Sequence, residues 1–434
     1  MLLIRGLRSL GQGAMVVDLT LYLKQLHWSG AAIGGVTSAA GLVGAALILG
    51  VGVLSDRIGR RPFLLIYEMM TLVAAIAACF TVKGFVLVLA IVLAGFGRGQ
   101  SGAAGPFSPA EQAWLARHVN QSSRGPVFSL NNAVGFVGMA IGSMIGGVPD
   151  IIQSASPIAR YRPVFAMVAV ISLFCTFLLL RLREDGTATE ASTAPARGGE
   201  APALSAKVDE RPAAAQVRDA SILKDSGAPE AQQDRQIRAR ENVAMLKLAS
   251  VNVLNGLAVG LTGPLIAYWF SVRYHVGTAA IGTTLAIGFL MTGATSLFNG
   301  WLAGRMGMVR SVTWMRVIGS SLMLALPFMP NFAAASVLYV VRGAINRGTQ
   351  GNRSALSASL TRDSRRGLAT SVNALSMRLP SSIGPTISGY LFDAGWLNLP
   401  LVLTAVLQLA NAALYQWIFG SYDARSSRAK GEAH

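Results

Sequence analysis

The sequence predicts an all-α polytopic membrane protein, with twelve transmembrane helices in two repeated six-helix bundles. Three observations predict this fold class: the composition, the number of long apolar segments, and a repeat between the two halves of the chain. Of the 434 residues, 52% are hydrophobic and only 13% are charged. The mean hydropathy is +0.49. A soluble chain of this length would need more charge to cover its surface, so the composition favours a protein that spans a membrane.

The formal net charge of +17 could indicate a nucleic-acid-binding protein, but its distribution argues against that class. The basic residues are thinly spread between apolar runs. Eleven of the twenty acidic residues lie between Glu184 and Asn242. This stretch is rich in Ala, Pro, Ser and Gly, so we predict a disordered cytoplasmic linker over 184–242. It separates an N-terminal bundle (1–183) from a C-terminal bundle (243–420), which a cytoplasmic tail (421–434) follows.

Twelve segments are long and apolar enough to cross a bilayer, which takes about 20 mainly apolar residues. Six precede the linker and six follow it. The predicted spans are Leu2–Leu23, Ala31–Leu54, Pro62–Val82, Phe85–Ala110, Pro126–Val148, Tyr161–Leu180, Ala244–Phe270, Ala279–Ala303, Val309–Met329, Phe332–Leu360, Gly367–Phe392 and Leu397–Phe419.

The basic residues of the connecting loops predict the orientation of these spans. One set of connections, together with the C-terminal tail, carries fourteen Lys and Arg residues, whereas the opposite set carries five. Because positive loops stay on the cytoplasmic side, both termini and the linker are expected in the cytoplasm. The predicted location is the plasma (inner) membrane.

The two halves repeat at a spacing of about 248 residues. Ala31-Ala-Ile-Gly34 matches Ala279-Ala-Ile-Gly282, and Arg98-Gly99 corresponds to Arg342-Gly343. Repeated halves joined by a linker are typical of transporters that rock about a site near the bilayer midplane. The repeat therefore predicts a substrate site between the two bundles.

The loop after the second span carries the most specific motif. Gly52-x-Leu54-Ser55-Asp56-Arg57-x-Gly59-Arg60-Arg61 resembles the signature of the major facilitator superfamily. The resemblance implies the twelve-helix fold of that family and a cytoplasmic gate. The predicted gate residues are Gly52, Asp56, Arg57, Gly59 and Arg60, with Glu111 as a partner for Arg57 or Arg60. The alternative is a plain basic loop that only fixes topology.

A weaker resemblance points to the drug/proton antiporter branch of the same family. The fifth span contains Gly138-x3-Gly142-Ser143-x2-Gly146-Gly147, where that branch usually has Pro at the position of Ser143. The eleventh span keeps the Gly-Pro pair as Gly384-Pro385. Glycine-rich packing of helices in lipid would produce the same spacing without antiport.

Asp18, in the first span, is the candidate proton-coupling residue. A charge near the bilayer centre costs about 2.5–3.5 kcal/mol on insertion scales, so each one needs a reason. The resemblance to the drug/proton antiporter branch implies a functional acid on this helix, because members of that branch often carry one there. The alternative is a carboxylate near the helix end that is solvated from outside.

Several other polar residues within the spans are candidates for substrate binding. Membrane arginines without local carboxylates could attract an anionic substrate or could bond to helix carbonyls. Glu68 is expected to pair near the cytoplasmic face, and Trp269 is expected in the outer aromatic belt. The predicted substrate-binding set is Arg98, Tyr22, Asn131, Asn255, Arg342, Arg347 and Arg378.

The leading functional hypothesis is a secondary transporter that exports a small molecule in exchange for protons. The alternatives are a proton-linked permease or exchanger for an organic anion, and a membrane sensor or assembly component that does not transport. No phosphate-binding loop, nucleophile elbow or metal-ligand spacing of histidines indicates an enzyme. The expected partners are the substrate, protons and lipid. No cofactor, metal or nucleic acid is expected, and the chain is expected to be a monomer.

Overall fold

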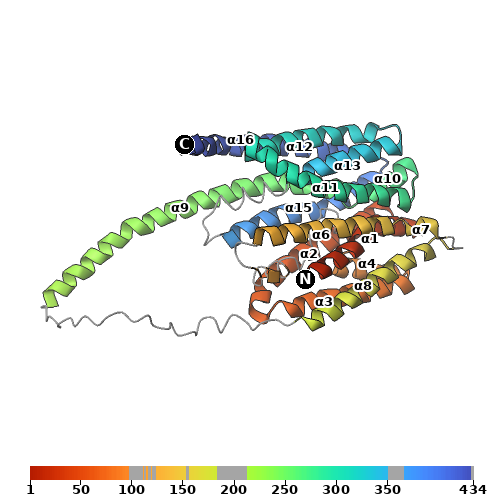
Figure 1. Cartoon of the computed structure of the whole chain (residues 1–434), viewed down its shortest axis with the longest axis horizontal. Helices are drawn as coiled ribbons and strands as arrows, with labels where there is room; N and C mark the ends of the chain where they lie inside the picture. The colour runs from red at the N-terminus through yellow and green to blue at the C-terminus, as the bar shows by residue number, and fades with distance from the viewer. Residues whose placement is uncertain are drawn as a thin grey trace.

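The computed structural model describes residues 1–96, 111, 114–115, 119, 124–152, 156–182, 213–349 and 366–431. Within these ranges every regular element is a helix, which confirms the predicted fold class. The helices run roughly parallel and antiparallel to one another, and the two halves of the chain lie side by side (Figure 1).

In its described residues, the N-terminal half has six long or medium helices and two short ones at a turn. The helices are α1 (Leu2–Gln25), α2 (Gly30–Ile58), α3 (Arg61–Phe80), α4 (Gly84–Ala94), α6 (Arg124–Ile145), α7 (Val148–Ile151), the 3₁₀ turn η3 (Ala159–Tyr161) and α8 (Arg162–Arg181). The bounds of α1, α2, α3, α6 and α8 lie within a few residues of predicted spans, and α4 begins beside the predicted fourth span but ends at Ala94. The second part of the predicted fourth span lies outside the described residues.

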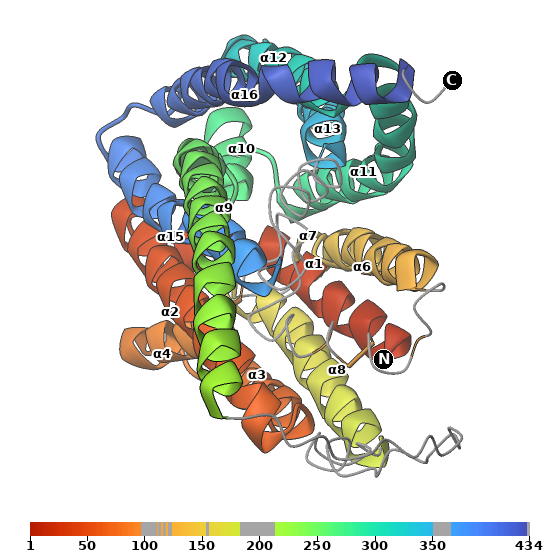
Figure 2. The same ribbon diagram turned by 90° about the vertical axis from the view of Figure 1, so that its left-hand side faces the viewer.

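In the described residues of the C-terminal half the long helices follow one another in the same way, but the short elements fall at other places. Its helices are α9 (Ala213–Thr262), α10 (Ile266–Tyr274), α11 (Thr278–Met306), α12 (Met308–Ala325), the 3₁₀ turn η4 (Leu326–Phe328), α13 (Phe332–Gly348), α15 (Arg366–Asp393) and α16 (Leu399–Gly431). Figure 2 shows the two halves as two groups of helices seen along the bundle.

Three boundaries differ from the sequence prediction. The predicted seventh span is divided into α9 and α10 at residues 263–265, because Pro264 lacks the N–H that a continuous helix needs. Helix α9 begins at Ala213, inside the stretch expected to be disordered. Its first part projects beyond the bundle (Figure 1) and is rich in Ala, Gln and Arg, which favour helix. Helix α16 likewise continues to Gly431, through most of the predicted tail.

Seven helical segments in the described ranges are long and apolar enough to cross a membrane. They are Gly30–Ile48, Arg61–Phe80, Val127–Ile151, Ala159–Arg181, Asp234–Thr262, Val309–Phe328 and Leu399–Gly420. Gly84–Ala94 and Thr278–Thr292 are shorter apolar helices. Helix α1 is not in this set, and it carries Arg5, Arg8 and Asp18. These charged residues lower the mean hydropathy of α1, although most of the helix is buried in the bundle.

Each half is held together by a pair of helices that pack at very short range. Helix α1 packs on α6, and its repeat equivalent α9 packs on α15. A Cβ atom added at Gly13 would collide with the carbonyl oxygen of Met139, and one at Gly260 would collide with that of Ser381. Small residues at these points let the helix backbones approach closely, which is how helices associate in lipid.

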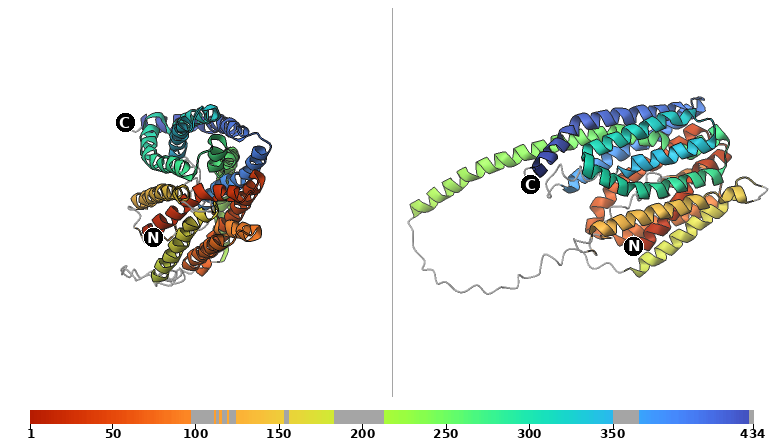
Figure 3. Two further views of the ribbon diagram at one scale, coloured as in Figure 1. Left: turned by 90° about the vertical axis from the view of Figure 1, so that its right-hand side faces the viewer. Right: turned by 45° about the horizontal axis from the view of Figure 1, so that its top comes forward.

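The two halves meet through α2 against α15 and α6 against α11 (Figure 3). These two interfaces are also equivalent in the repeat. Gly34 faces the carbonyl of Pro385, and Gly282 faces the carbonyl of Ser143. Ser143, where the antiporter motif usually has Pro, thus occupies the same place in its interface as Pro385 does in the other. We call the end of the bundle opposite both chain termini the distal end.

Candidate functional site

Asp18 is enclosed in the part of α1 that packs most tightly. Every residue from Gly13 to Leu23 is buried, and Asp18 itself is 0% exposed. Among the described residues, neither of its carboxyl oxygens has a hydrogen-bond partner. In this arrangement of the helices Asp18 is therefore shielded from water, in contrast to a solvated carboxylate at a helix end.

Tyr22 lies one turn further along α1, within an aromatic cluster of the N-terminal half. Its ring centroid is 5.6 Å from that of Tyr161 and 5.0 Å from that of Phe165. The side chain is buried among its own half, and its predicted role in substrate binding stays a prediction. The prediction that Trp269 lies in the outer aromatic belt is wrong. Its side chain is fully buried against Phe270 and Tyr274.

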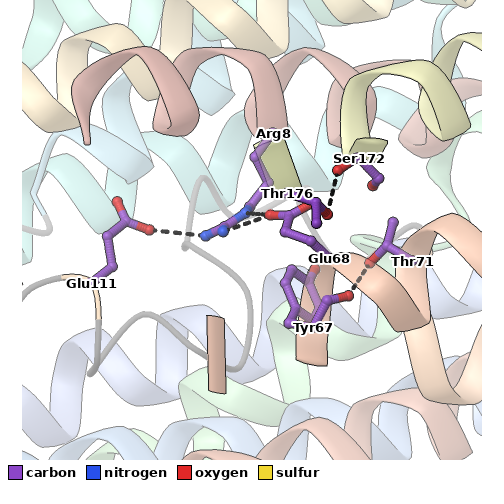
Figure 4. A network of polar contacts seen from close by, with 7 residues as sticks. All are labelled: Arg8, Tyr67, Glu68, Thr71, Glu111, Ser172 and Thr176. Carbon is purple, nitrogen blue, oxygen red and sulfur yellow. Dashed lines mark hydrogen bonds and ion pairs between the residues drawn. The ribbon is translucent and has the colours of Figure 1, made fainter. Parts of the chain in front are cut away.

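A network of buried charges lies towards the N-terminal end of α1 (Figure 4). An Arg8 guanidinium nitrogen (Nη2) is 2.6 Å from Oε1 of Glu68, and its Nε donates to the same oxygen at 2.8 Å. Nη1 donates to Oε2 of Glu111 at 3.2 Å. The ring of Tyr67 lies 5.3 Å from the guanidinium carbon. Arg8 thus joins α1 to α3 and to the segment that holds Glu111, and the expected pairing of Glu68 is confirmed.

Glu111 has a second partner, since Asn131 donates to its Oε1 at 3.3 Å. The sequence predicted Arg57 or Arg60 as its partner, whereas the structure shows Arg8. Gly52, Asp56 and Arg57 lie within α2, but the structure does not describe the side chains of Asp56 and Arg57 or the burial of Gly52. The described donors to Glu111 therefore belong to the bundle interior, and the predicted gate pairing stays a prediction.

The described part of the signature loop makes a tight turn between α2 and α3. Gly59 has φ +100°, a conformation that side chains beyond glycine rarely adopt, and it ends α2. Arg60 precedes the first residue of α3 and is buried. Arg61 donates to the carbonyl oxygens of Leu179 and Leu180 at 3.1 and 2.6 Å, which fixes the end of α8.

The C-terminal half carries the predicted arginines in a different setting. Arg342 on α13 has a buried Nε without a hydrogen-bond partner in the described part of the chain. Arg347 lies over the ring of Phe289 at 5.1 Å, and Arg378 on α15 is half-buried. Asn255 is buried, with its amide nitrogen 3.8 Å from the Met377 sulfur. Arg98 lies outside the described residues.

Four charged residues that the structure makes prominent were not singled out from the sequence. Arg5 and Arg8 lie in the first span beside Asp18, and counting every charge in that span would have found them. Asp150 lies in the short helix α7 and Asp393 ends α15. They are 243 residues apart, close to the 242-residue spacing of Arg124-Gly and Arg366-Gly in the same part of the repeat. In the described ranges His, Cys, Asp and Glu side chains form no group of three that could hold a metal ion.

Comparison with known proteins agrees with this geometry. The chain is 23% identical over 344 residues to the uncharacterized membrane protein YJR124C of Saccharomyces cerevisiae, covering 77% of this chain and 74% of that protein. Its fold is similar to an inward-facing, occupied bacterial homolog of the human lysosomal transporter Spinster, with a TM-score of 0.70 and 13% identity, covering 97% of this chain and 95% of the other.

A D-xylose-proton symporter has a similar fold as well, with a TM-score of 0.67 and 15% identity over 95% of this chain and 96% of that one. A model of the Major Facilitator Superfamily matches residues 1–225 and 248–434, which include both bundles. The repeat, the signature loop and the pairwise packing of equivalent helices agree with this match. The chain belongs to the major facilitator superfamily.

Proposed function

We propose that this protein is a secondary transporter that exports a small molecule in exchange for protons, and that Asp18 carries the proton. The observation that supports this most is a fully buried carboxyl group without a hydrogen-bond partner among the described residues. An ionised carboxylate in such surroundings is costly unless it is paired. Asp18 therefore needs either a proton or a cationic ligand when the helices are arranged as they are here.

This requirement provides a means of coupling. A proton on Asp18 favours the arrangement in which the carboxyl is enclosed, and loss of the proton favours one in which water or substrate reaches it. Exchange follows if substrate and proton stabilise opposite arrangements. Membership of the superfamily supports a transport role, and the weaker motif in α6 and α15 supports the antiporter branch.

Transport in proteoliposomes tests the proposal. Purified protein is reconstituted around a pH-sensitive dye, and nucleosides, sugars, organic cations and organic anions are added one class at a time. We expect one class to cause proton movement with wild-type protein. Asp18→Asn should abolish this proton movement but keep exchange of labelled substrate across the membrane, because the amide cannot release a proton.

Thr20→Val is the matched control. Thr20 lies in the same buried stretch of α1, and its hydroxyl also has no described partner, but the change removes no titratable group. Coupled transport should survive in this variant. Coupled transport that persists in Asp18→Asn would refute the role of Asp18, and absence of flux for every class would favour the non-transporting alternative.

A second candidate function is a proton-linked permease or exchanger for an organic anion. The buried Nε of Arg342, which lacks a described partner, favours it. Citrate and benzoate are suitable probes, because a ligand that binds the folded state raises its apparent stability. The thermal shift that either anion causes should disappear in Arg342→Gln or Arg378→Gln. An unchanged shift in both variants would remove this candidate.

We also propose that the protein is a monomer in the plasma membrane. Both termini are proposed to lie in the cytoplasm. The excess of basic residues in one set of loops supports this orientation. A protease-sensitive tag at either terminus should be cut only in inside-out vesicles. Cleavage in right-side-out vesicles would reverse the orientation.

A further inference from the structure

The two halves are joined at the distal end by a carboxylate from the C-terminal half. Asp393 is the last residue of α15, and it lies against the start of α2 in the other half. Its Oδ1 accepts a hydrogen bond from the backbone N–H of Gly30 at 2.7 Å, and its Oδ2 accepts one from the N–H of Ala31 at 2.8 Å. The first two residues of α2 thus donate to one carboxylate across the interface.

The equivalent contact exists with the halves exchanged. Asp150, in the short helix α7, accepts from the backbone N–H of Ala279 in the first turn of α11 at 2.8 Å through its Oδ2. Asp150 and Asp393 are related by the repeat, and so are the starts of α2 and α11. Each half therefore supplies one carboxylate and receives the other. We call these two contacts the distal carboxylate clasps.

Physical chemistry explains why carboxylates occupy these positions. The first N–H groups of a helix have no partner within the helix, and the helix dipole favours a negative charge there. In α2 the side chain of Ser29 already accepts from Ala32, so Asp393 takes donors that the helix's own cap leaves free. The fit is close, because a Cβ atom at Gly277 would collide with the Asp150 carboxylate.

Other contacts between the halves lie at the same end of the bundle. Lys24 donates to the Ser271 hydroxyl at 3.0 Å, and the Thr386 hydroxyl donates to Ser38 at 2.7 Å. None of these joins a charge to a helix start. The clasps are thus the contacts whose loss would remove both a hydrogen bond and a favourable charge–dipole interaction when the distal end opens.

We propose that Asp150 and Asp393 are gate residues, which hold the distal end of the transporter closed by capping the first turn of a helix in the opposite half. The clasps break when the halves separate at this end and form again when they close. The role rests on the proposed transport cycle. However, the role concerns the balance between the open and the closed distal end, which can be measured without a substrate. The experiment can therefore refute this role without bearing on the proton-coupling role of Asp18.

The test is a distance across the distal end. In a Cys79→Ser/Cys175→Ser background, spin labels are placed at Lys83→Cys and Phe328→Cys, which are exposed and lie one in each half. Double electron–electron resonance in lipid nanodiscs then reports the populations of short and long separations. Asp150→Ala/Asp393→Ala should raise the ratio of long to short separations by about tenfold or more, the equivalent of losing charged hydrogen bonds.

Two further variants make the result decisive. Gly277→Ala leaves both carboxylates in place but displaces Asp150, and it should also increase the long separation, to a smaller degree. Asn331→Ala is the matched control. Asn331 caps α13 within its own half by accepting from Ala334, so its loss should leave the separations unchanged. Unchanged separations in a folded double variant, or an equal increase in Asn331→Ala, would overturn the proposal.

Discussion

The two halves of the bundle share their backbone packing but hold charge in different ways. In the N-terminal half Arg8 is paired with Glu68 and Glu111 inside the bundle, and Asp18 stands apart without a described partner. In the C-terminal half Arg316, Arg342 and Arg378 are buried or half-buried, and the repeat position of Asp18 is Ile266. The repeat thus includes the contacts between helices, whereas the charged residues inside the bundle differ between the two halves.

This difference assigns separate roles to the halves. A titratable carboxyl is suited to binding and releasing a proton, and cationic side chains are suited to an anionic group of a substrate. The clasps at the distal end are shared equally. The buried carboxyl of Asp18, by contrast, has no equivalent in the C-terminal half, where its repeat position is Ile266.

The largest effect is expected when the charge network of the N-terminal half is broken. Glu68→Ala leaves the buried Arg8 with Glu111 as its remaining described carboxylate partner. Removing one member of a buried ion pair typically costs about 3–5 kcal/mol. Unfolding in mixed micelles of increasing denaturing detergent should show this loss. Glu68→Gln keeps the shape and one acceptor, so a smaller loss is expected. Equal losses in the two variants would mean that packing, and not charge, stabilises this site.

The shared packing can be tested with one glycine from each half. Gly13→Ala and Gly260→Ala each place a methyl group against a backbone carbonyl of the neighbouring helix. Overpacking of this kind costs about 1–3 kcal/mol, and the two losses should be similar because the contacts are equivalent. Gly35→Ala is the control, since a Cβ there meets nothing within 4 Å. A large loss from one glycine alone would show that the halves are not packed alike.

Asp18→Asn tests the isolated carboxyl against the paired ones. Because the change replaces a buried carboxyl, which carries a proton in the proposed cycle, by an amide of similar shape and breaks no described pair, the free energy of unfolding should fall by less than about 1 kcal/mol. The same unfolding assay, run beside Glu68→Ala, gives the comparison. A loss as large as that of Glu68→Ala would mean that Asp18 has a structural partner in the part of the chain outside the described residues.

Much of the fold could be predicted from the sequence, because the length and apolarity of a span are local properties. The same locality explains the failures. Helix α10 was missed because a window of hydropathy does not register the backbone effect of Pro264. Arg8 was overlooked because the partners that stabilise it, Glu68 and Glu111, come from distant parts of the chain. The clasps depend on how the two halves meet. In the sequence they are indicated only by the occurrence of an aspartate at corresponding positions of the two halves, Asp150 and Asp393.

The smallest effect is expected at the ion pair outside the bundle. On α9, Nε of Arg238 lies 2.8 Å from Oδ2 of Asp234, and the two side chains are 63% and 37% exposed. Exposed pairs at this helical spacing contribute less than about 0.5 kcal/mol because water and salt screen them. Arg238→Ala should therefore leave the unfolding midpoint almost unchanged, since arginine and alanine have similar helix propensity. A loss above about 1 kcal/mol would mean that the projecting part of α9 packs on another surface. The Arg238–Asp234 pair would then resemble the buried Arg8 network more closely than its exposure indicates.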